Sequence, residues 1–400
     1  MASQFNPFDP DYRANPYTHY HEWRSDDPVR PSDLVPAGIW ILMRYADSVS
    51  VLRDRRFSAD RSQATINQQV EATQVDVGPL GRAQTMLTSD PPDHTRLRTL
   101  VSKAFTPNVV EEMRPHIQEI VDELLDAVQD AGRMDVIRDL AYPLPVIVIT
   151  EMLGVRPEDR EHFKKWSGDI AVTLDPVVAP EALQRAQQSA LELADYFRGV
   201  VEERRRNPRD DLISGLIAAE EQGDKLSEEE LYATCMLLLI AGNETTTNLI
   251  GNGMLALLRN PDQLQKLRDD PSLIESAVEE LLRYDSPVQA TGRVATEDTE
   301  IGGKKIDKGD MLVTSLGAAN RDPERFPDPD RLDITRQDNR HVAFGYGLHF
   351  CLGAPLARLE GQAAINTLLR RFPNLRLGTE APEWRETITL RGLKSLPVAF

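Results

Sequence analysis

One long helical pattern, from Ser227 to Arg259, constrains the fold more than any other feature of this sequence. Ser227 and Glu230 have the spacing of a capping box, and no proline interrupts the pattern before Arg259. At about 1.5 Å per residue, such a helix extends for roughly 50 Å. Its middle, MLLLIAG, is apolar on every side, and a helix of that kind is buried all round. The sequence therefore predicts a large domain built around a buried central helix.

The pattern of predicted secondary structure changes along the rest of the chain. Helical periodicity dominates from about residue 91 to 285, whereas short strand-like runs and turns occur in about 1–60 and 286–400. The stretch TEIGGKKI predicts a hairpin with its turn at Gly302 and Gly303, and the C-terminal TITLRGLKSLPVAF predicts another hairpin. Neither a repeat nor a Gly/Ser linker divides the chain. We expect a single domain over residues 1–400 that is mainly α with a smaller β region (α+β). The polar stretch from Phe57 to Thr88 lacks a clear period, which predicts a functional loop that covers a substrate.

Composition excludes several classes of function. The chain has 46 Lys and Arg against 64 Asp and Glu, a net charge of -18, whereas nucleic-acid binding needs a basic face. No stretch approaches the roughly 20 apolar residues that cross a bilayer. The opening residues show neither a basic leader nor an apolar run. We therefore expect a cytoplasmic protein with no nucleic-acid or membrane partner.

The two cysteines, Cys235 and Cys351, have different surroundings. Two are too few for a disulfide framework or a Cys-rich zinc or iron–sulfur site. Cys235 lies in the apolar run CMLLLIAG and is predicted to be a core residue. Cys351 lies in AFGYGLHFCLGAPLARLE, where glycines allow close backbone approach to a flat ligand and a helix beginning near Ala354 favours a thiolate. Such surroundings are what an iron ligand needs; the alternative is a structural cysteine in a glycine-rich turn.

The centre of the long helix is unexpectedly polar. Residues 242–247, GNETTT, are mostly modest or poor helix formers placed where the helix should be buried. A local conflict of this kind usually marks function. The alternative is structural: the hydroxyls bond to carbonyls one turn earlier, and Glu244 forms a salt bridge.

Three motifs resemble those of the cytochrome P-450 superfamily. The cysteine loop is similar to its haem-binding signature at Phe344, Gly345, Gly347, His349, Cys351, Gly353, Ala357 and Arg358. The polar turn is similar to its oxygen-activation motif at Ala241, Gly242, Glu244 and Thr245. Glu280 and Arg283, with Arg331, match its Glu-x-x-Arg network. Together with the propionate contacts named below, these elements follow the order of the family from about residue 90 to 360.

The resemblance implies a triangular fold with haem b between the long helix and the cysteine loop. Cys351 is then the metal ligand, and Glu244 and Thr245 deliver protons to bound oxygen. The other implied cofactor contacts are His94, Arg98, Ala241, Gly242, Arg293, Phe344, Gly345, His349 and Gly353, of which His94, Arg98, Arg293 and His349 face propionates. The implied substrate pocket includes Leu238, Ala241, Val288, Ala290, Thr291, Leu393 and Lys394, whose side chains suggest a largely apolar compound.

The implied activity is that of a monooxygenase. It activates O2 with two electrons from a ferredoxin or flavodoxin and its reductase, and it hydroxylates or epoxidises a small, largely apolar molecule. A basic docking surface for that partner is predicted at Arg96, Lys103, Arg340 and Arg358. Three alternatives stay open: a peroxide-driven peroxygenase, against which Glu244 and Thr245 argue; a haem gas sensor, which would bring an output domain; and a haem-free helical scaffold.

Overall fold

A computed structural model describes residues 6, 9–33, 38–66, 79–176, 178–219, 226–379 and 381–400. The chain forms two compact units. The first unit comprises Met1–Thr73, Asn248–Cys351 and Leu369–Phe400, and the second comprises Gln74–Thr247 and Leu352–Leu368. The predicted loop over Phe57 to Thr88 falls partly on residues 67–78, which lie outside the described ranges. The single domain expected from the sequence stays a prediction.

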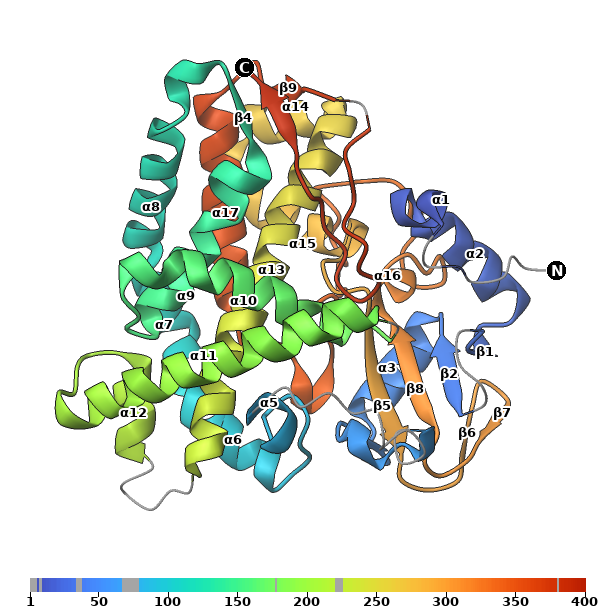
Figure 1. The fold of residues 1–400 in the computed structure, drawn as a ribbon. Coiled ribbons are helices and arrows are strands. Elements are labelled where there is room, and N and C mark those ends of the chain that lie inside the picture. Colours follow the sequence, from blue (N-terminus) through green and yellow to red (C-terminus); the bar gives the residue numbers. More distant parts are fainter. Residues whose placement is uncertain are drawn as a thin grey trace. The chain divides into compact units, whose positions relative to one another are not determined.

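The first unit contains a five-stranded sheet in the order β1-β2-β8-β5-β3 (Figure 1). β2 runs parallel to β8, with Trp40 opposite Leu312, and the other neighbours are antiparallel. Val29, Leu42, Phe57 and Leu312 bury side chains from this sheet in one apolar cluster. The strands are β1 Val29–Pro31, β2 Ile39–Leu42, β3 Phe57–Ser58, β5 Ala290–Ala295 and β8 Met311–Ser315.

Two further strand pairs belong to the first unit. β6 Thr299–Ile301 and β7 Lys304–Ile306 form the hairpin that the Gly-Gly pair predicted, and Gly302 and Gly303 both have positive φ in its turn. β9 Arg376–Leu377 pairs with β10 Pro397–Ala399. The hairpin expected over the last residues is wrong in detail, because 386–394 form only isolated bridges, such as Trp384 with Leu393.

The first unit also contains several helices. The amino-terminal helices bury Tyr12, Tyr17, Tyr20 and Trp23 in a second apolar cluster. The helices are α1 Pro10–Ala14, α2 Pro16–Asp26, α3 Tyr45–Arg53, α14 Pro261–Asp269, α15 Ile274–Tyr284 and α16 Leu316–Ala319, with 3-10 turns η1 Arg61–Gln63, η9 Pro271–Leu273 and η10 Gly347–His349.

The second unit is almost entirely helical. Phe163 of α10 packs edge-to-face on Tyr196 of α11, and these two helices lie side by side in Figure 1. Its helices are α5 Pro79–Arg82, α6 Asp93–Ser102, α7 Pro107–Glu112, α8 Arg114–Asp126, α9 Pro143–Met152, α10 Arg160–Ala171, α11 Pro180–Arg206 and α12 Leu212–Ala219, and it includes one short strand, β4 Arg133–Asp135. Its short helical turns are η3 Lys103–Phe105, η4 Gln129–Ala131, η5 Ile137–Ala141, η6 Pro157–Asp159 and η7 Val172–Leu174.

The predicted central helix is α13, Glu228–Arg259, which contributes residues to both units. Its capping box is formed in both directions: the Ser227 backbone N–H donates to Glu230 Oε2 at 2.8 Å, and the Glu230 N–H donates to Ser227 Oγ at 3.2 Å. α17, Ala354–Arg371, begins where the sequence predicted. Among the described helices, none is both long and apolar enough to cross a membrane. The predicted mainly α architecture with small sheets is confirmed.

Candidate functional site

The loop before α17 holds Cys351 in a defined backbone geometry. The Cys351 N–H donates to the carbonyl of Phe344 at 2.9 Å, which closes the loop on itself. Gly345 and Gly347 have φ of +72° and +74°, a region that side chains rarely adopt. A Cβ at Gly347 would lie 2.6 Å from the carbonyl oxygen of Leu52. The glycines therefore let this loop pack closely on the end of α3.

The cysteine loop presents an accessible thiol beside apolar side chains. Cys351 is exposed, and Tyr346, Leu348 and Phe350 are among the few large apolar residues of the described chain that are also exposed. Phe350 lies edge-to-face to Phe344, with the ring centroids 6.2 Å apart. An accessible thiol on a glycine-shaped, apolar loop fits a single thiolate ligand of a large flat cofactor.

The predicted propionate contacts lie on elements of both units. In the second unit, His94 and Arg98 are one turn apart on α6; His94 is buried and Arg98 half-buried. In the first unit, Arg293 is a buried residue of β5 whose Nη1 donates to the carbonyl of Gly292 at 2.8 Å, and His349 is half-buried in η10. A propionate that is removed from water when the cofactor binds needs a positively charged partner, and a buried or half-buried cation can provide it.

The polar turn of α13 has one exposed face. Ala241 is exposed and Thr245 half-exposed, although the residues around them on this helix are mostly buried. The Thr245 hydroxyl donates to the carbonyl of Ala241 at 2.8 Å, the back-bond that the structural alternative foresaw. Glu244 is 2% exposed. A Cβ at Gly242 would meet Ile149 of α9, 3.4 Å from its Cγ1, so this glycine brings α9 and α13 close together.

Sequence reasoning missed a buried acid next to this turn. Glu360 of α17 is 2% exposed, and burial raises the pKa of its carboxyl to about 8, while a hydrogen bond with Thr246 acts in the opposite direction. The carboxyl is therefore mostly protonated at neutral pH. The only signal in the sequence is its helical register, because Glu360 follows Leu356 and Leu359 on α17.

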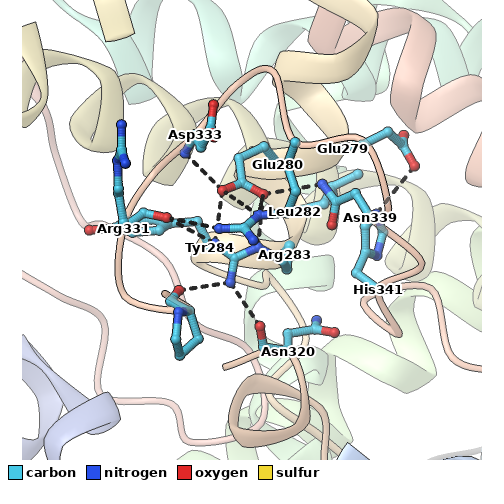
Figure 2. Close-up of polar contacts among 12 residues, drawn as sticks. Glu279, Glu280, Leu282, Arg283, Tyr284, Asn320, Arg331, Asp333, Asn339 and His341 are labelled. Carbon is cyan, nitrogen blue, oxygen red and sulfur yellow. Dashed lines mark hydrogen bonds and ion pairs between the residues drawn. The ribbon is translucent and has the colours of Figure 1, made fainter. Parts of the chain in front are cut away.

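Glu280 and Arg283 form a fully buried ion pair on α15 (Figure 2). Arg283 Nε and Nη2 each donate to a Glu280 oxygen at 2.8 Å, and both side chains are 0% exposed. Arg283 Nη1 also donates to the carbonyls of Asn320 and Pro329, at 2.9 and 2.8 Å. Burial lowers the pKa of Arg283, and Glu280 opposes that effect. The pair thus ties α15 to two segments that are distant in sequence.

The structure corrects the third member of this network. Arg331 was predicted to complete it, but its side chain is exposed and only its carbonyl takes part, accepting from Arg283 Nη2 at 3.3 Å. The second guanidinium is that of Arg336, whose Nε lies 3.2 Å from Glu280 Oε2. The backbone N–H of Asp333 and the amide of Asn339 also donate to Glu280, at 2.9 and 3.2 Å. Both donors are visible in Figure 2.

The predicted substrate contacts differ in exposure. Val288, Ala290 and Thr291 of the first unit are half-buried. Leu393 is 0% exposed, and Lys394 is exposed with its Nζ 3.3 Å from Glu386. Leu238 lies on α13 in the second unit and is 8% exposed. The half-buried residues of β5 have the exposure expected of pocket walls, whereas Leu393 does not.

Comparison with known proteins identifies the family. The profile of the Cytochrome P450 family matches residues 39–384. Cytochrome P450 CYP107DY1 of Priestia megaterium is 48% identical over 371 residues, covering 90% of this chain and 89% of the relative. 6-deoxyerythronolide B hydroxylase of Saccharopolyspora erythraea is 43% identical over 389 residues, covering 96% and 95%.

Solved structures agree with this assignment. The crystal structure of P450BioI in complex with an acyl carrier protein that carries hexadec-9Z-enoic acid has a TM-score of 0.91 and 44% identity, covering 98% of this chain and 99% of the other. The chain therefore belongs to the cytochrome P450 family of haem-dependent monooxygenases.

Proposed function

We propose that this protein is a haem-thiolate monooxygenase that carries haem b, receives two electrons from separate redox proteins and hydroxylates or epoxidises a small, largely apolar substrate. The observation that carries the proposal is the cysteine loop, in which the backbone N–H of the exposed Cys351 donates to the Phe344 carbonyl and Gly345 and Gly347 have positive φ. When bound there, the haem supplies oxygen binding and oxidising power, and the thiolate favours O–O cleavage. We place the reaction in the cytoplasm.

The chain's own residues would hold and position this cofactor. Cys351 would be the thiolate ligand of the iron, and Phe344, Gly345, His349 and Gly353 would lie beside it. His94, Arg98 and Arg293 would neutralise the propionates. Ala241, which is exposed, and its neighbour Gly242 would be the small residues of α13 beside the cofactor. Glu244 holds a proton for delivery, and the Thr245 hydroxyl orients the proton acceptor. A peroxygenase would not need the acid–alcohol pair, which is present here.

The substrate is proposed only by class. The names of the relatives refer to 6-deoxyerythronolide B in one case and to a carrier-linked hexadecenoic acid in another. We propose Leu238, Ala241, Val288, Ala290 and Thr291 as pocket walls. Of the two predicted residues in the last loop, the exposed Lys394 is a stronger candidate than Leu393, which is 0% exposed. A fatty acyl, terpenoid, steroid or macrolide compound would suit these side chains.

Electrons would come from an acidic ferredoxin or flavodoxin and its reductase. Of the proposed docking cations, Arg96 is already bonded to Glu230 at 2.6 Å and to Asp93 at 2.9 Å, so it offers less charge to a partner. Lys103 is exposed, and the Arg340 side chain is 82% exposed despite a contact with Asp338 at 3.0 Å. We therefore give Lys103 and Arg340 more weight than Arg96, with Arg358 as the remaining cation.

The test is an isotope-labelling experiment on the haem-loaded protein with a ferredoxin, its reductase and NADPH. Substrates are first chosen from fatty acid, terpenoid, steroid and macrolide panels by their shift of the haem absorption band. We expect one atom from ¹⁸O2 in the product, and loss of product when the ferredoxin is omitted. Product labelled from H2¹⁸O instead, or formation that needs only peroxide, would contradict the proposal.

A further inference from the structure

The second unit contains a buried polar cluster that the sequence did not predict. It consists of Tyr142, Ser167, Asn243 and Thr247, with Glu244 beside it. Tyr142 lies between η5 and α9, Ser167 on α10, and the others on α13. Ser167, Asn243, Glu244 and Thr247 are each at most 2% exposed. Burying so many polar groups costs free energy unless they hydrogen-bond to one another or to bound water.

Asn243 is the centre of this cluster. Its Nδ2 donates to Ser167 Oγ at 3.0 Å, and its Oδ1 accepts from the Thr247 hydroxyl at 3.4 Å. Both ends of the amide are thus used, which fixes its orientation and links α13 to α10. Since the Ser167 hydroxyl accepts this bond, its own proton can be donated to a further group.

Glu244 lies next to the same part of α10. A Cβ at Gly168, the residue after Ser167, would be only 3.9 Å from Glu244 Oε1. The absence of a side chain at Gly168 therefore leaves the Glu244 carboxylate close to the α10 backbone. Asn243 and Glu244 are consecutive, so the hydrogen bond from Asn243 to Ser167 also helps to fix the position of the Glu244 backbone relative to α10.

Tyr142 is near exposed residues of α10 as well as this cluster. Burial raises the pKa of its phenol above the usual value; interactions with Asn243 and Ser167 lower it, and the negative charges of Glu244 and Glu161 raise it. Glu161 is exposed on α10, and the Lys164 Nζ lies 5.0 Å from the centre of the Tyr142 ring. Tyr142 therefore lies near an exposed carboxylate as well as the buried one.

The Tyr142 hydroxyl is buried, and no described residue forms a hydrogen bond of normal geometry with it, although Ser167 and Asn243 are near enough to interact. Buried hydroxyls of this kind are commonly satisfied by a bound water. A hydroxyl both donates and accepts, so it can pass a proton without ionising.

We propose that the hydroxyls of Tyr142 and Ser167, positioned by Asn243, return protons from solvent to Glu244 after it has donated one. This proposal rests on the proposed function of Glu244. For each proton delivered, Glu244 regains its O–H bond by taking a proton from a neighbouring hydroxyl. That hydroxyl takes a proton from the next hydroxyl, and solvent water supplies the proton that restores the outermost one. The net change is one proton moved inward, while the electrons come from the redox protein.

The experiment measures how much O2 ends as peroxide when the haem-loaded protein oxidises NADPH through a ferredoxin and its reductase, without substrate. Forming peroxide takes two electrons and two protons, whereas carrying O2 to water takes twice as many of each. Slower proton supply therefore raises the peroxide released per NADPH. For Tyr142→Phe and Ser167→Ala we expect a rise of about threefold to tenfold in the ratio of peroxide to water, the range for one lost hydrogen bond.

Matched controls exist on α11. Tyr196→Phe removes a phenol whose hydroxyl donates to Asp159 at 2.8 Å, and Ser189→Ala removes a buried hydroxyl that donates to Asp169 at 2.6 Å. Each of these hydroxyls thus donates to a carboxylate other than that of Glu244. Both controls should keep the wild-type ratio, and the carbon monoxide spectrum of each variant verifies that haem is bound.

Double variants separate a relay from a structural effect. In a Glu244→Gln background, Tyr142→Phe should add nothing, because the groups act in one pathway. A wild-type ratio for Tyr142→Phe and Ser167→Ala, or an effect that multiplies with that of Glu244→Gln, overturns the relay. If Glu244→Gln itself leaves the ratio unchanged, the proposed role of Glu244 fails, and the relay fails with it.

Discussion

Glu280→Ala should lower the free energy of unfolding by about 3–5 kcal/mol, the cost of leaving a buried charge without its partner. The wild-type carboxylate contacts two guanidiniums, those of Arg283 and Arg336, and accepts from the Asp333 N–H. Its removal leaves the Arg283 side chain at 0% exposure with only neutral partners. Urea unfolding followed by circular dichroism measures the effect, since urea does not screen charge.

An exposed pair of the same spacing provides the control for Glu280. Glu111 and Arg114 are also three residues apart on the chain, with a nitrogen–oxygen distance of 2.5 Å, but their side chains are 62% and 43% exposed. Glu111→Ala should therefore destabilise the protein much less than Glu280→Ala does. Equal losses for the two variants would show that the α15 network does not stabilise the fold in the way proposed.

Gly347→Ala should destabilise the cysteine loop by about 2–5 kcal/mol, from backbone strain and overpacking together. The new methyl group would lie 2.6 Å from the Leu52 carbonyl oxygen and 3.3 Å from the Arg53 Cα, and φ at this position is +74°. Both neighbours are backbone atoms of α3 and its end, so no rotamer change relieves the contact. Haem occupancy after expression and the urea midpoint are the measurements.

Gly303→Ala isolates the part of this effect that comes from φ alone. Gly303 has a φ of +78°, and a Cβ there would meet nothing within 4 Å. The free energy of unfolding of the Gly303→Ala variant should fall by about 1–2 kcal/mol, and the variant should still bind haem. If Gly347→Ala is no worse than Gly303→Ala, the close packing of the loop on α3 is not important for its stability.

Features with a strong local pattern could be predicted from the sequence. The capping box, followed by a helical pattern without proline, predicted the first residue of α13 to within one position. The Gly-Gly pair predicted the turn between β6 and β7. Glu280 and Arg283 could be paired because three residues on a helix place side chains on one face. Each of these depends on neighbours along the chain.

Features that depend on distant segments could not be predicted. Arg331 and Arg336 lie in the same irregular stretch, and only the path of the backbone decides that Arg336 reaches Glu280 while Arg331 contributes a carbonyl. The cluster of Tyr142, Ser167 and Asn243 joins three separate elements. Near the end of the chain, Leu390 and Leu393 form isolated bridges, and β10 pairs with β9 rather than with a neighbouring strand of a local hairpin. No periodicity encodes such contacts.

The central claim is that Cys351 is the thiolate ligand of a haem. The direct measurement is the absorption spectrum of the haem-loaded protein, reduced with dithionite and exposed to carbon monoxide, for the wild type, Cys351→Ala and Cys235→Ala. Cys235 is a buried thiol whose pKa burial raises to about 12, so it serves as the matched control. We expect a strongly red-shifted Soret band in the wild type and Cys235→Ala, and its loss in Cys351→Ala. A red-shifted band that persists in Cys351→Ala, or a folded wild type that binds no haem, would contradict the account.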